Sequence, residues 1–570
     1  MSALDPLLNE PKIAYFSMEI GLRTDVPTYS GGLGVLAGDT IKACADLTLP
    51  VVAVTLVSRQ GYFRQELDAG GRQFAHPSPW DPEQLMTRLP PQVRVTLDRR
   101  SVAVAAWLYW VESPTGGRVP VLFLDTDLPE NAPEHRELTS FLYGRDAAYR
   151  LRQEAVLGLG GGKMLQALGV TVRKYHMNEG HSALLTLELL ERFRRPIESV
   201  WDEALVWDVE RIKDLCVFTT HTPVEAGHDR FDYDLVERVL GAPLPLPVLQ
   251  RFAGPDQLNM TMLALNLSRF VNGVAKKHGE VSRHLFPGYE ISAITNGVHS
   301  FTWTGPDMAR LYDASMPGWA NDPELLVRVD NIPDDALWAA HQSAKARLIA
   351  LVKRVTGADM ALDTLTLGFA RRMTPYKRAD LVFSDLKRLA DIGDGRLQIV
   401  LAGKAHPQDL PGQRIIERLF EAIEALRGHV TVAYLPDYNM DMALTVIAGS
   451  DVWLNTPRRP HEASGTSGMK ATHNGVPNFS VLDGWWIEGH VEGVTGWSIG
   501  PPPRESTLDA VDDERDADDL YEKLGQVILP LYERDRRGWI AVMKHAIAKN
   551  ASFFNCHRMM RRYVTEAYLR

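Results

Sequence analysis

The sequence predicts an α/β protein built from two doubly wound domains, each with a largely parallel sheet between helices. Short apolar runs alternate with amphipathic stretches along the whole chain, which is the pattern of βαβ units. Polar or basic loops follow several of the apolar runs. The chain has 570 residues, which is too many for one compact core. Because ligands of open α/β sheets bind at the carboxyl ends of the strands, we expect chemistry in these loops.

Three apolar runs of the first half are interpreted as buried strands: PVVAVTLV at 50–57, VPVLFLDTDLPE at 119–130 and LCVFTTHTP at 215–223. The glycine-rich stretch YSGGLGVLAGD, residues 29–39, is expected to open a helix. It has neither the G-x-G-x-x-G spacing of a dinucleotide fingerprint nor the Gly-Lys-Ser/Thr ending of a P-loop. A backbone turn that meets a phosphate or a sugar is the remaining hypothesis. A second glycine cluster, at 158–164, indicates close helix packing.

Four strands are predicted in the second half, each running into a polar or basic loop: 365–372, 397–407, 430–438 and 450–460. Helical patterns cover residues 333–357, which we expect to link the two domains, and 412–428. The stretch 501–519 reads as an exposed loop. The tail from about residue 535 is helical, and we expect it to fold back on the first domain.

The bulk composition excludes several classes of protein. A net charge of −10 and a pI near 6.0 argue against a general nucleic-acid binder, which needs a basic surface. The three cysteines are far apart, which fits a reducing cytoplasm rather than a disulfide framework. No signal peptide is apparent, and no apolar run is long enough to suggest a membrane span. We therefore expect a soluble, cytoplasmic protein that holds anions through local clusters of cations.

Two clusters of basic residues follow predicted strands. Arg371 and Arg372 come directly after one strand, and Lys377 and Arg378 are expected to open the next helix. Cations at a helix N-terminus make an anion site. Arg458 and Arg459 follow another strand and precede the small-residue run 463–468, whose backbone amides could approach a phosphate. Two such loops suggest two bound phosphates.

Histidines near strand ends offer further candidates. His176, Glu179 and His181 do not have the His-Glu-x-x-His spacing of a helical metal site, so we predict no metal there. Hydrogen bonding to a polyol is the favoured interpretation. His221 and Asn296 also follow apolar runs, and single residues of this kind are usually structural unless neighbours converge on them. No Gly-x-Ser-x-Gly elbow appears, which disfavours serine acyl transfer, whereas a glycoside hydrolase stays possible on spacing alone.

Several long motifs in one order resemble the α-glucan phosphorylases (glycogen, starch and maltodextrin phosphorylases), in particular their short prokaryotic branch. The resemblance runs from AYFSMEIGLRTDVPTYSGGLGVLAGD through RQGYFRQ, HMNEGHSALL, FTTHTPVEAGHDRF, NGVAKKHGEVSR, AITNGVHSFTW and GFARRMTPYKR to DVWLNTPRRPHEASGTSGMKATHNG and SVLDGWW. It covers nearly the whole chain, and the last long block is highly specific.

The resemblance implies a cofactor and roles for particular residues. Family members carry pyridoxal 5′-phosphate as a Schiff base on the lysine that here is Lys470. Such a lysine must be unprotonated to react, so we expect a desolvated pocket that lowers its pKa. By the same carry-over, the catalytic residues are Lys470, Arg372, Lys377 and His221. The cofactor-binding residues are Lys470, Thr466, Arg371, Lys377 and Gly32. The substrate-binding residues are Glu462, Ser464, Gly465, Tyr376, Asn296, His181, Glu179 and Gly31.

The implied reaction is reversible phosphorolysis of a terminal α-1,4-linked glucose to glucose 1-phosphate, with retained configuration. The cofactor phosphate is thought to relay a proton through inorganic phosphate. The implied architecture is that of the GT-B glycosyltransferases, two Rossmann-like domains facing across a cleft. We place their bounds at residues 1–331 and 332–534, with the tail 535–570 packing back on the first. The family is commonly dimeric, so a homodimer is possible.

Two departures and two alternatives accompany the resemblance. Arg371 stands where many relatives have lysine, which leaves its geometry open but not its charge. The first motif begins at Ala14, which predicts no control by N-terminal phosphorylation or AMP. A nucleotide-sugar-dependent glucan synthase without the cofactor is one alternative. A non-catalytic glucan-binding relative is the other.

Overall fold

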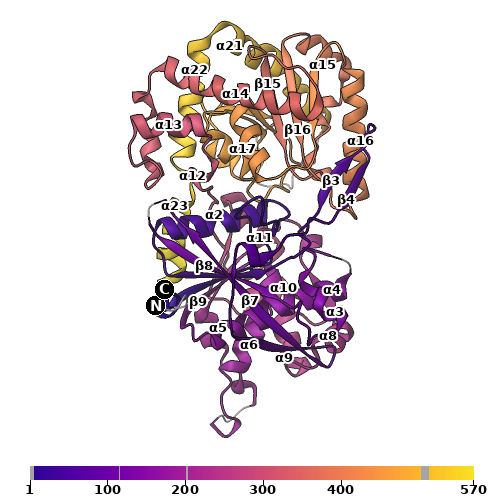
Figure 1. Ribbon diagram of the computed structural model, residues 1–570, viewed down its shortest axis with the longest axis vertical. Coiled ribbons are helices and arrows are strands. Elements are labelled where there is room, and N and C mark those ends of the chain that lie inside the picture. The colour runs from indigo at the N-terminus through magenta and orange to yellow at the C-terminus, as the bar shows by residue number, and fades with distance from the viewer. Residues whose placement is uncertain (1–4, 115, 145, 200–202, 502–512, 570) are drawn as a thin grey trace.

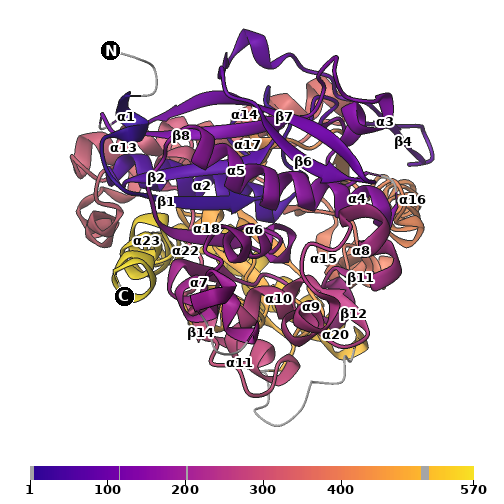
Figure 2. The same ribbon diagram turned by 90° about the horizontal axis from the view of Figure 1, so that it is seen from below.

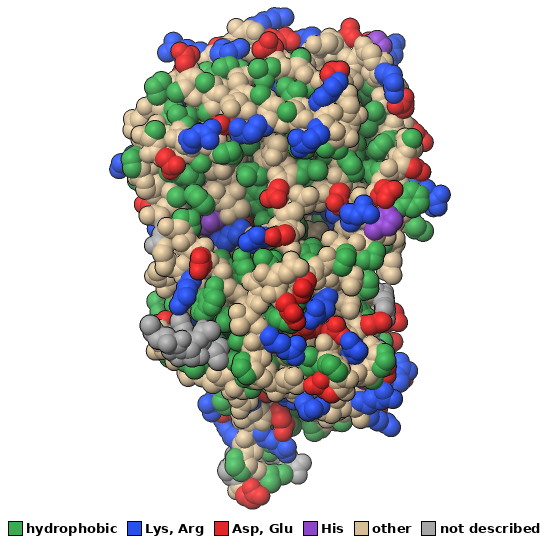
Figure 3. Space-filling model, viewed as in Figure 1, with side chains coloured by type: hydrophobic (Ala, Val, Ile, Leu, Met, Phe, Trp, Pro, Cys, Tyr) green, Lys and Arg blue, Asp and Glu red, His purple; other side chains and the backbone are tan. Residues whose placement is uncertain are grey.

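The computed structural model describes residues 5–114, 116–144, 146–199, 203–501 and 513–569, and it is a mixed α/β structure with two large sheets. Figure 1 shows the indigo and magenta first half of the chain below the orange second half. Charged side chains of both signs are interspersed over the face seen in Figure 3. No helix in the described part of the chain is long and apolar enough to cross a membrane.

The first sheet has ten strands and combines a parallel part with an antiparallel edge. The parallel strands, in spatial order, are β14 (Ser292–Ala293), β13 (Phe270–Gly273), β10 (Cys216–Thr219), β9 (Val172–Asn178), β1 (Lys12–Ser17), β2 (Val51–Leu56) and β8 (Arg118–Asp125). The antiparallel edge consists of β7 (Arg100–Glu112), β5 (Thr87–Arg88) and β6 (Val93–Leu97). The β6–β7 hairpin turns at Asp98 and Arg99, both with positive φ, and so short a turn forces antiparallel pairing.

The second sheet is parallel throughout its six strands. Its spatial order is β17 (Thr431–Leu435), β16 (Leu397–Ala402), β15 (Leu365–Ala370), β18 (Val452–Asn455), β19 (Asn478–Val481) and β20 (Gly496–Ile499). The strand order reverses between β15 and β18, and in the first sheet between β1 and β9. Such switch points are where open α/β sheets bind ligands, because the loops that follow the two strands diverge there.

The central strands of both sheets are buried on both faces. In β1, Ala14 and Phe16 belong to one apolar core and Ile13 and Tyr15 to another, as the two-residue period of a strand requires. Figure 2 shows α5 and α6 across these strands. The helices that precede residue 331 are α1 (Asp5–Leu8), α2 (Gly32–Asp46), α3 (Pro133–Arg136), α4 (Ala147–Ala155), α5 (Gly161–Ala167), α6 (Leu185–Arg192), α7 (Val209–Leu215), α8 (Tyr233–Leu240), α9 (Leu246–Ala253), α10 (Met260–Asn266), α11 (Lys276–Leu285), α12 (Ser300–Trp303) and α13 (Pro306–Ser315). Of these, α13 packs in the core of the second sheet and lies among the upper helices of Figure 1.

The helices of the second half separate its strands, and the last of them reach the first half. They are α14 (Asp334–Thr356), α15 (Leu386–Gly393), α16 (Leu410–Ala425), α17 (Met440–Gly449), α18 (Ser467–Thr472), α19 (Trp486–Gly489), α20 (Asp513–Lys523), α21 (Leu529–Arg534), α22 (Arg536–His545) and α23 (Cys556–Tyr563). Side chains of α22 belong to the core of the second sheet. Side chains of α23 pack in the same core as α2, beside which α23 lies in Figure 1.

A hairpin of the first half also reaches the second half. It is formed by β3 (Arg64–Leu67) and β4 (Gln73–His76), drawn beside α16 in Figure 1. The Gln65 backbone N–H donates to Asp437 Oδ1 at 2.9 Å, and the side-chain Nε2 of Gln73 donates to the Ala405 carbonyl at 2.8 Å. These bonds connect the two halves at the edge of the second sheet.

The structure confirms most of the predicted elements and corrects two. The seven predicted strands correspond to β2, β8, β10, β15, β16, β17 and β18, and the two predicted helices to α14 and α16. The glycine cluster at 158–164 packs closely, because a Cβ at Gly158 would lie 2.5 Å from the Leu185 nitrogen. The expectation that Lys377 and Arg378 open a helix is wrong, because residues Pro375–Lys377 form only a 3₁₀ turn. Of the predicted loop at 501–519, residues 513–519 begin α20, and 502–512 lie outside the described residues.

Candidate active site

One cavity of about 550 Å³ lies at the carboxyl ends of strands from both sheets. Every residue that the resemblance assigns to the site lines it. From the first half these are Gly31, Gly32, Glu179, His181, His221 and Asn296, and from the second half Arg371, Arg372, Tyr376, Lys377, Glu462, Ser464, Gly465, Thr466 and Lys470. Residues from both switch points therefore share one space.

Lys470 lies in α18, a short helix after the small-residue run, and its side chain is buried. The residue is 7% exposed, and its Nζ lies 3.9 Å from the centre of the Trp303 ring. Burial lowers the pKa of Lys470 to about 8, although the Asp39 carboxylate acts in the opposite direction. This confirms the expected desolvated amine. A substantial fraction of this lysine is thus uncharged near pH 8, which is the form that attacks an aldehyde.

The small residues before Lys470 are small for two different reasons. Ala463, Ser464 and Gly465 line the cavity, and Gly465 has φ of 72°, a conformation that favours glycine. Gly468 is small because of packing, since a Cβ there would lie 2.2 Å from Asn478 Oδ1. The run therefore opens the cavity in its first part and lets α18 approach β19 in its last part.

The carboxylate of Glu462 pairs with two of the predicted anion-binding cations. Arg371 Nη2 donates to Glu462 Oε2 at 2.9 Å, and Lys377 Nζ donates to the same oxygen. Burial raises the pKa of Glu462, but the charges of Lys377 and Arg371 outweigh burial and lower it overall. Among the described residues, Arg371 Nε and Nη1 are buried without a hydrogen-bond partner. The guanidinium therefore has unused donors for an anion.

Arg372 is a third cation in the same cavity, and it is held among tyrosines. Burial acts to lower the pKa of Arg372, but Tyr376 and Tyr62 outweigh it and the pKa is raised. Lys377 Nζ lies 4.5 Å from the centre of the Tyr376 ring. Arg372 thus stays charged in a desolvated place, which is where a charge interacts most strongly with an anion.

The glycine loop presents bare backbone to the cavity at the N-terminus of α2. A Cβ built on Gly31 or Gly32 would meet nothing within 4 Å, so both positions face open space. Gly34 and Gly38 instead serve packing, because a Cβ at Gly38 would lie 1.8 Å from the Gly21 carbonyl oxygen. The carboxylate of Glu19 accepts from the Ser30 N–H at 2.6 Å, which fixes the loop. The loop therefore offers room for a ligand at a helix N-terminus.

The loop after β9 uses Glu179 to hold itself together. Glu179 Oε2 accepts from the His221 N–H at 2.7 Å and from Thr222 Oγ1 at 2.9 Å, and Oε1 accepts from the Gly180 N–H at 3.0 Å. Its φ is 72°. The carboxylate of Glu179 is thus engaged by the protein, although the residue borders the cavity.

Three neutral polar residues face the cavity from the first half. His221 Nε2 lies 2.6 Å from Asn178 Oδ1, and burial lowers the pKa of His221 to about 3. Burial also lowers the pKa of His181 to about 3. In the described part of the chain, His181 Nδ1 and Asn296 Oδ1 are buried without a hydrogen-bond partner. His176, in contrast, contacts Tyr568 and Thr219 and does not line the cavity.

Of the second predicted anion loop, the small-residue run lines this cavity, but Arg458 and Arg459 do not. Arg459 Nη2 donates to Asp516 Oδ1 at 2.8 Å, Arg458 pairs with Asp513, and Arg378 Nη2 donates to Asp516 Oδ2 at 2.7 Å. The interpretation of Arg458 and Arg459 as a phosphate loop is therefore wrong, because acidic residues of α20 occupy them. The sequence gives no sign of this pairing, since α20 lies more than fifty residues further along the chain.

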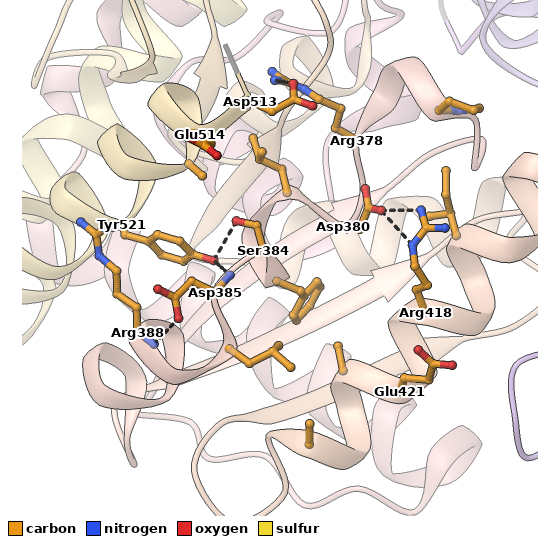
Figure 4. A pocket seen from close by; sticks show the side chains of 18 of the residues that line it. Arg378, Asp380, Ser384, Asp385, Arg388, Arg418, Glu421, Asp513, Glu514 and Tyr521 are labelled. Carbon is orange, nitrogen blue, oxygen red and sulfur yellow. Dashed lines mark hydrogen bonds and ion pairs between the residues drawn. The ribbon is translucent and has the colours of Figure 1, made fainter. Parts of the chain in front are cut away.

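A larger cavity, of about 1010 Å³, lies beside this cluster; Arg378 and Arg458 line it, but none of the residues that the resemblance assigns to the site does. Figure 4 shows Arg418 of this cavity paired with Asp380, 2.6 Å apart, and elsewhere on the wall Arg378 pairs with Asp513 at 2.8 Å. Its charges are largely compensated within the protein, so we do not assign chemistry to it.

Sequence reasoning missed several residues of the smaller cavity. They are Glu19, Tyr62, Tyr143, Arg150, Trp303, Lys404, His406 and Tyr438. Trp303 could have been found, because it ends the motif AITNGVHSFTW. Tyr62, just before β3, could have been found in the same way, because it lies in the motif RQGYFRQ, whereas Tyr143 belongs to none of these motifs.

Known proteins with similar sequences identify the family of this chain. Residues 248–492 match the family model "Carbohydrate phosphorylase". The chain is 38% identical to the maltodextrin phosphorylase of Thermococcus litoralis, over 99% of this chain and 71% of that one. It is 36% identical to the glycogen phosphorylase of Mycobacterium tuberculosis (98% and 70% covered) and 34% identical to that of Aquifex aeolicus (98% and 86% covered). The chain belongs to the carbohydrate phosphorylase family.

Proposed function

We propose that this chain is an α-glucan phosphorylase that uses pyridoxal 5′-phosphate. It would transfer the terminal glucose of an α-1,4-glucan to inorganic phosphate, giving α-glucose 1-phosphate with retained configuration, and would run in both directions. The observation that carries the proposal is the buried amine of Lys470 in one cavity with the cations Arg371, Arg372 and Lys377. The names of the maltodextrin and glycogen phosphorylases among its relatives support it.

The proposed architecture is the GT-B arrangement of two α/β domains across a cleft. We assign residues 1–331 to one domain, 332–534 to the other, and 535–570 to a tail that packs back on the first. Support comes from the two separate sheets and from the cavity, whose lining comes from both halves. Closure of such domains excludes water, which favours phosphate over water as the acceptor.

The cavity fits the cofactor in charge and in space. Lys470 supplies a buried, partly uncharged amine, Arg371 has unpartnered N–H groups, and Gly32 leaves the helix N-terminus bare. We assign Thr466, Arg371, Lys377 and Gly32 to holding the cofactor and Lys470 to anchoring it. When bound, the cofactor would supply a phosphate group whose pKa, near 6, suits proton exchange at neutral pH.

We assign substrate phosphate to Arg372 and Lys377. Two phosphates about 5 Å apart repel by several kcal/mol at an effective dielectric near 20. Arg371, Arg372 and Lys377 would offset that repulsion and stabilise the charge that separates in the transition state. Since Glu462 pairs with two of these cations, an entering anion must displace its carboxylate or share the cations with it.

We assign the sugar hydroxyls to Glu462, Ser464, Gly465, Tyr376, Asn296, His181, His221 and Gly31. Asn296 Oδ1 and His181 Nδ1 have unused hydrogen-bonding capacity. His221 is neutral and, with a hydrogen on Nε2 toward Asn178, keeps a lone pair on Nδ1 for a hydroxyl donor. Glu179 would act by positioning His221 through the backbone N–H rather than by touching sugar.

The direct test is release of glucose 1-phosphate. Purified protein loaded with pyridoxal phosphate should form it from maltoheptaose and phosphate, and should elongate maltoheptaose when given glucose 1-phosphate. Glucan elongation from UDP- or ADP-glucose, without the cofactor, would instead identify a synthase. Glucan binding without either activity would identify a non-catalytic relative.

A further inference from the structure

Three side chains from distant segments meet where α2, α12 and α23 come together (Figure 1). They are Asp46 at the end of α2, His299 at the start of α12 and His557 in α23. Asp46 Oδ2 lies 2.7 Å from His299 Nε2 and 2.8 Å from His557 Nε2. The side chains are at most 4% exposed, and none of the three lines the candidate active site.

The hydrogen bonds of His557 leave its Nε2 lone pair facing the carboxylate of Asp46. His557 Nδ1 lies 3.1 Å from the Asn321 carbonyl oxygen, which can only accept, so Nδ1 carries a hydrogen. A neutral His557 then directs the lone pair of Nε2 at the carboxylate of Asp46. Two lone pairs at this distance repel, so a positive species must lie between them. That species is either a second proton on the imidazole or a metal ion.

The surroundings match those of metal-binding histidines. Such a histidine directs one ring nitrogen at the ion and donates the other N–H to a carbonyl or another oxygen, which fixes the tautomer. His557 has the Asn321 carbonyl in that place. His299 Nδ1 accepts from the Thr302 N–H at 3.3 Å, so an ion at Nε2 requires the ring hydrogen to move to Nδ1, where Thr302 Oγ1, 2.7 Å away, can accept it. Ser113 Oγ donates to Asp46 Oδ1 at 2.5 Å, which orients the carboxylate.

We propose that Asp46, His299 and His557 bind a divalent transition-metal ion of the Zn²⁺ class. Two imidazoles and a carboxylate suit Zn²⁺ better than Mg²⁺ or Ca²⁺, which prefer oxygen ligands. The three ligand atoms lie within 4.8 Å of one another. With bonds of about 2.0–2.2 Å, N and O ligands of one tetrahedral ion lie about 3.3 Å apart. Each histidine nitrogen must therefore move about half an ångström away from the Asp46 oxygen, and the two nitrogens, which lie within 4.8 Å of each other, must take up the same spacing. Water or the second Asp46 oxygen completes the coordination.

The ion's role is structural. Helix α2 begins at the glycine loop, His299 follows Asn296 by three residues, and His557 belongs to the tail. The ion therefore joins the C-terminal helix to two segments that also reach the active-site cavity. The site could not be recognised from sequence spacing, because 253 positions separate Asp46 from His299 and 258 separate His299 from His557.

The test is metal analysis of the full-length protein. Elemental analysis after purification, and again after chelation and addition of ZnCl₂, should find about one Zn²⁺ per chain. Addition of Zn²⁺ should raise the Tm of the chelated protein. Both effects should disappear in H299Q and H557Q. They should persist in H76Q, which removes a half-buried histidine that pairs with Glu66 outside this cluster.

Three results would overturn the proposal. One is chelated protein that takes up no Zn²⁺ and keeps its Tm on addition. Another is uptake by H557Q equal to that of H76Q, which would mean surface binding only. If the histidine variants do not fold, Co²⁺ added to the chelated parent protein decides, because a tetrahedral nitrogen-ligated Co²⁺ ion absorbs visible light. Failure to develop that absorption would leave the cluster as a proton-sharing ion pair.

Discussion

The two sides of the active-site cavity differ in the kind of polar group that they offer. The residues we assign from the second half include the cations Arg371, Arg372 and Lys377, with Glu462 as their counter-charge. Those assigned from the first half act as neutral groups, through His221, His181, Asn296 and bare backbone at the glycine loop. The charged residues on that side, Glu19, Arg150 and Glu179, are already paired within the protein.

This difference separates two tasks. Charged groups in a desolvated place bind and stabilise anions, and neutral donors and acceptors read hydroxyls without competing for phosphate. A change on the second-half side should therefore alter cofactor and phosphate binding. A change on the first-half side should alter glucan binding and leave phosphate binding largely as it was.

The largest effect is expected for K470A. Loss of the amine removes the anchor of the cofactor, so phosphorolysis of maltoheptaose should fall by about 1,000-fold or more. Absorbance of the bound cofactor after desalting should disappear as well. K404A is the matched control, because Lys404 lines the same cavity but pairs with Asp437. A K470A protein as active as the parent would show that the second-half side of the cavity takes no part in the reaction.

Glu462→Gln should separate phosphate binding from turnover. Without the carboxylate, Arg371 and Lys377 lose their internal counter-charge, so the cofactor-free protein should bind inorganic phosphate more tightly. A lost charge-assisted hydrogen bond to sugar costs about 1.5–3 kcal/mol, so kcat/KM for maltoheptaose should fall roughly 10- to 100-fold. Calorimetry and initial rates measure the two effects. E492Q, a carboxylate outside the cavity, should change neither, and weaker phosphate binding by E462Q would contradict this role.

Asn296→Ala should act from the first-half side alone. One neutral hydrogen bond contributes about 1 kcal/mol, so KM for maltoheptaose should rise roughly fivefold. KM for phosphate should remain within experimental error of the parent value. Initial rates with each substrate varied separately decide this, and an equal rise in both KM values would mean that the two sides are not specialised.

The smallest effect concerns Asp483, which accepts the Glu462 N–H at 2.8 Å. Burial raises the pKa of Asp483 to about 7, and the charge of Glu462 acts in the same direction. Between the unfolded pKa, near 4, and 7, the folded protein keeps a proton that the unfolded chain has released. This stabilisation is complete at low pH and is lost as pH rises through 7.

In D483N, which cannot ionise, the fall in Tm between pH 6 and pH 8 should be smaller than in the parent. Thermal melts of both proteins at the two pH values test this. An identical fall in the two proteins would show that Asp483 does not titrate in this range.

Much of this arrangement could be predicted from sequence, because it depends on local pattern. Continuous apolar runs identify strands such as β2 and β16, and the residues after β15 and β18 necessarily lie at one edge of a parallel sheet. The roles proposed for Lys470 and Glu462 came from the family motif rather than from physics. The antiparallel edge of the first sheet was not predicted. Its longest strand, β7, is buried along most of its length and therefore lacks the polar–apolar alternation that marks many antiparallel strands.

What could not be predicted depends on contacts between distant segments. In the sequence, Arg459 is close to Gly465 and is expected to bind an anion. Only the position of α20 shows that Arg459 is paired with Asp516 instead. Glu179 looks like a sugar-binding carboxylate, and only the loop after β10 shows that its oxygens are already engaged. In each case a charged side chain found its partner inside the protein, and no spacing in the sequence records such a pairing.

The most direct test of the central claim is to locate the cofactor chemically. The protein should be loaded with pyridoxal phosphate, reduced with borohydride, digested and analysed by mass spectrometry. We expect one phosphopyridoxyl group per chain on the peptide that contains Lys470, and none on that lysine when borohydride is omitted. Modification spread over surface lysines, with Lys470 unmodified in a folded and saturated sample, would contradict the account.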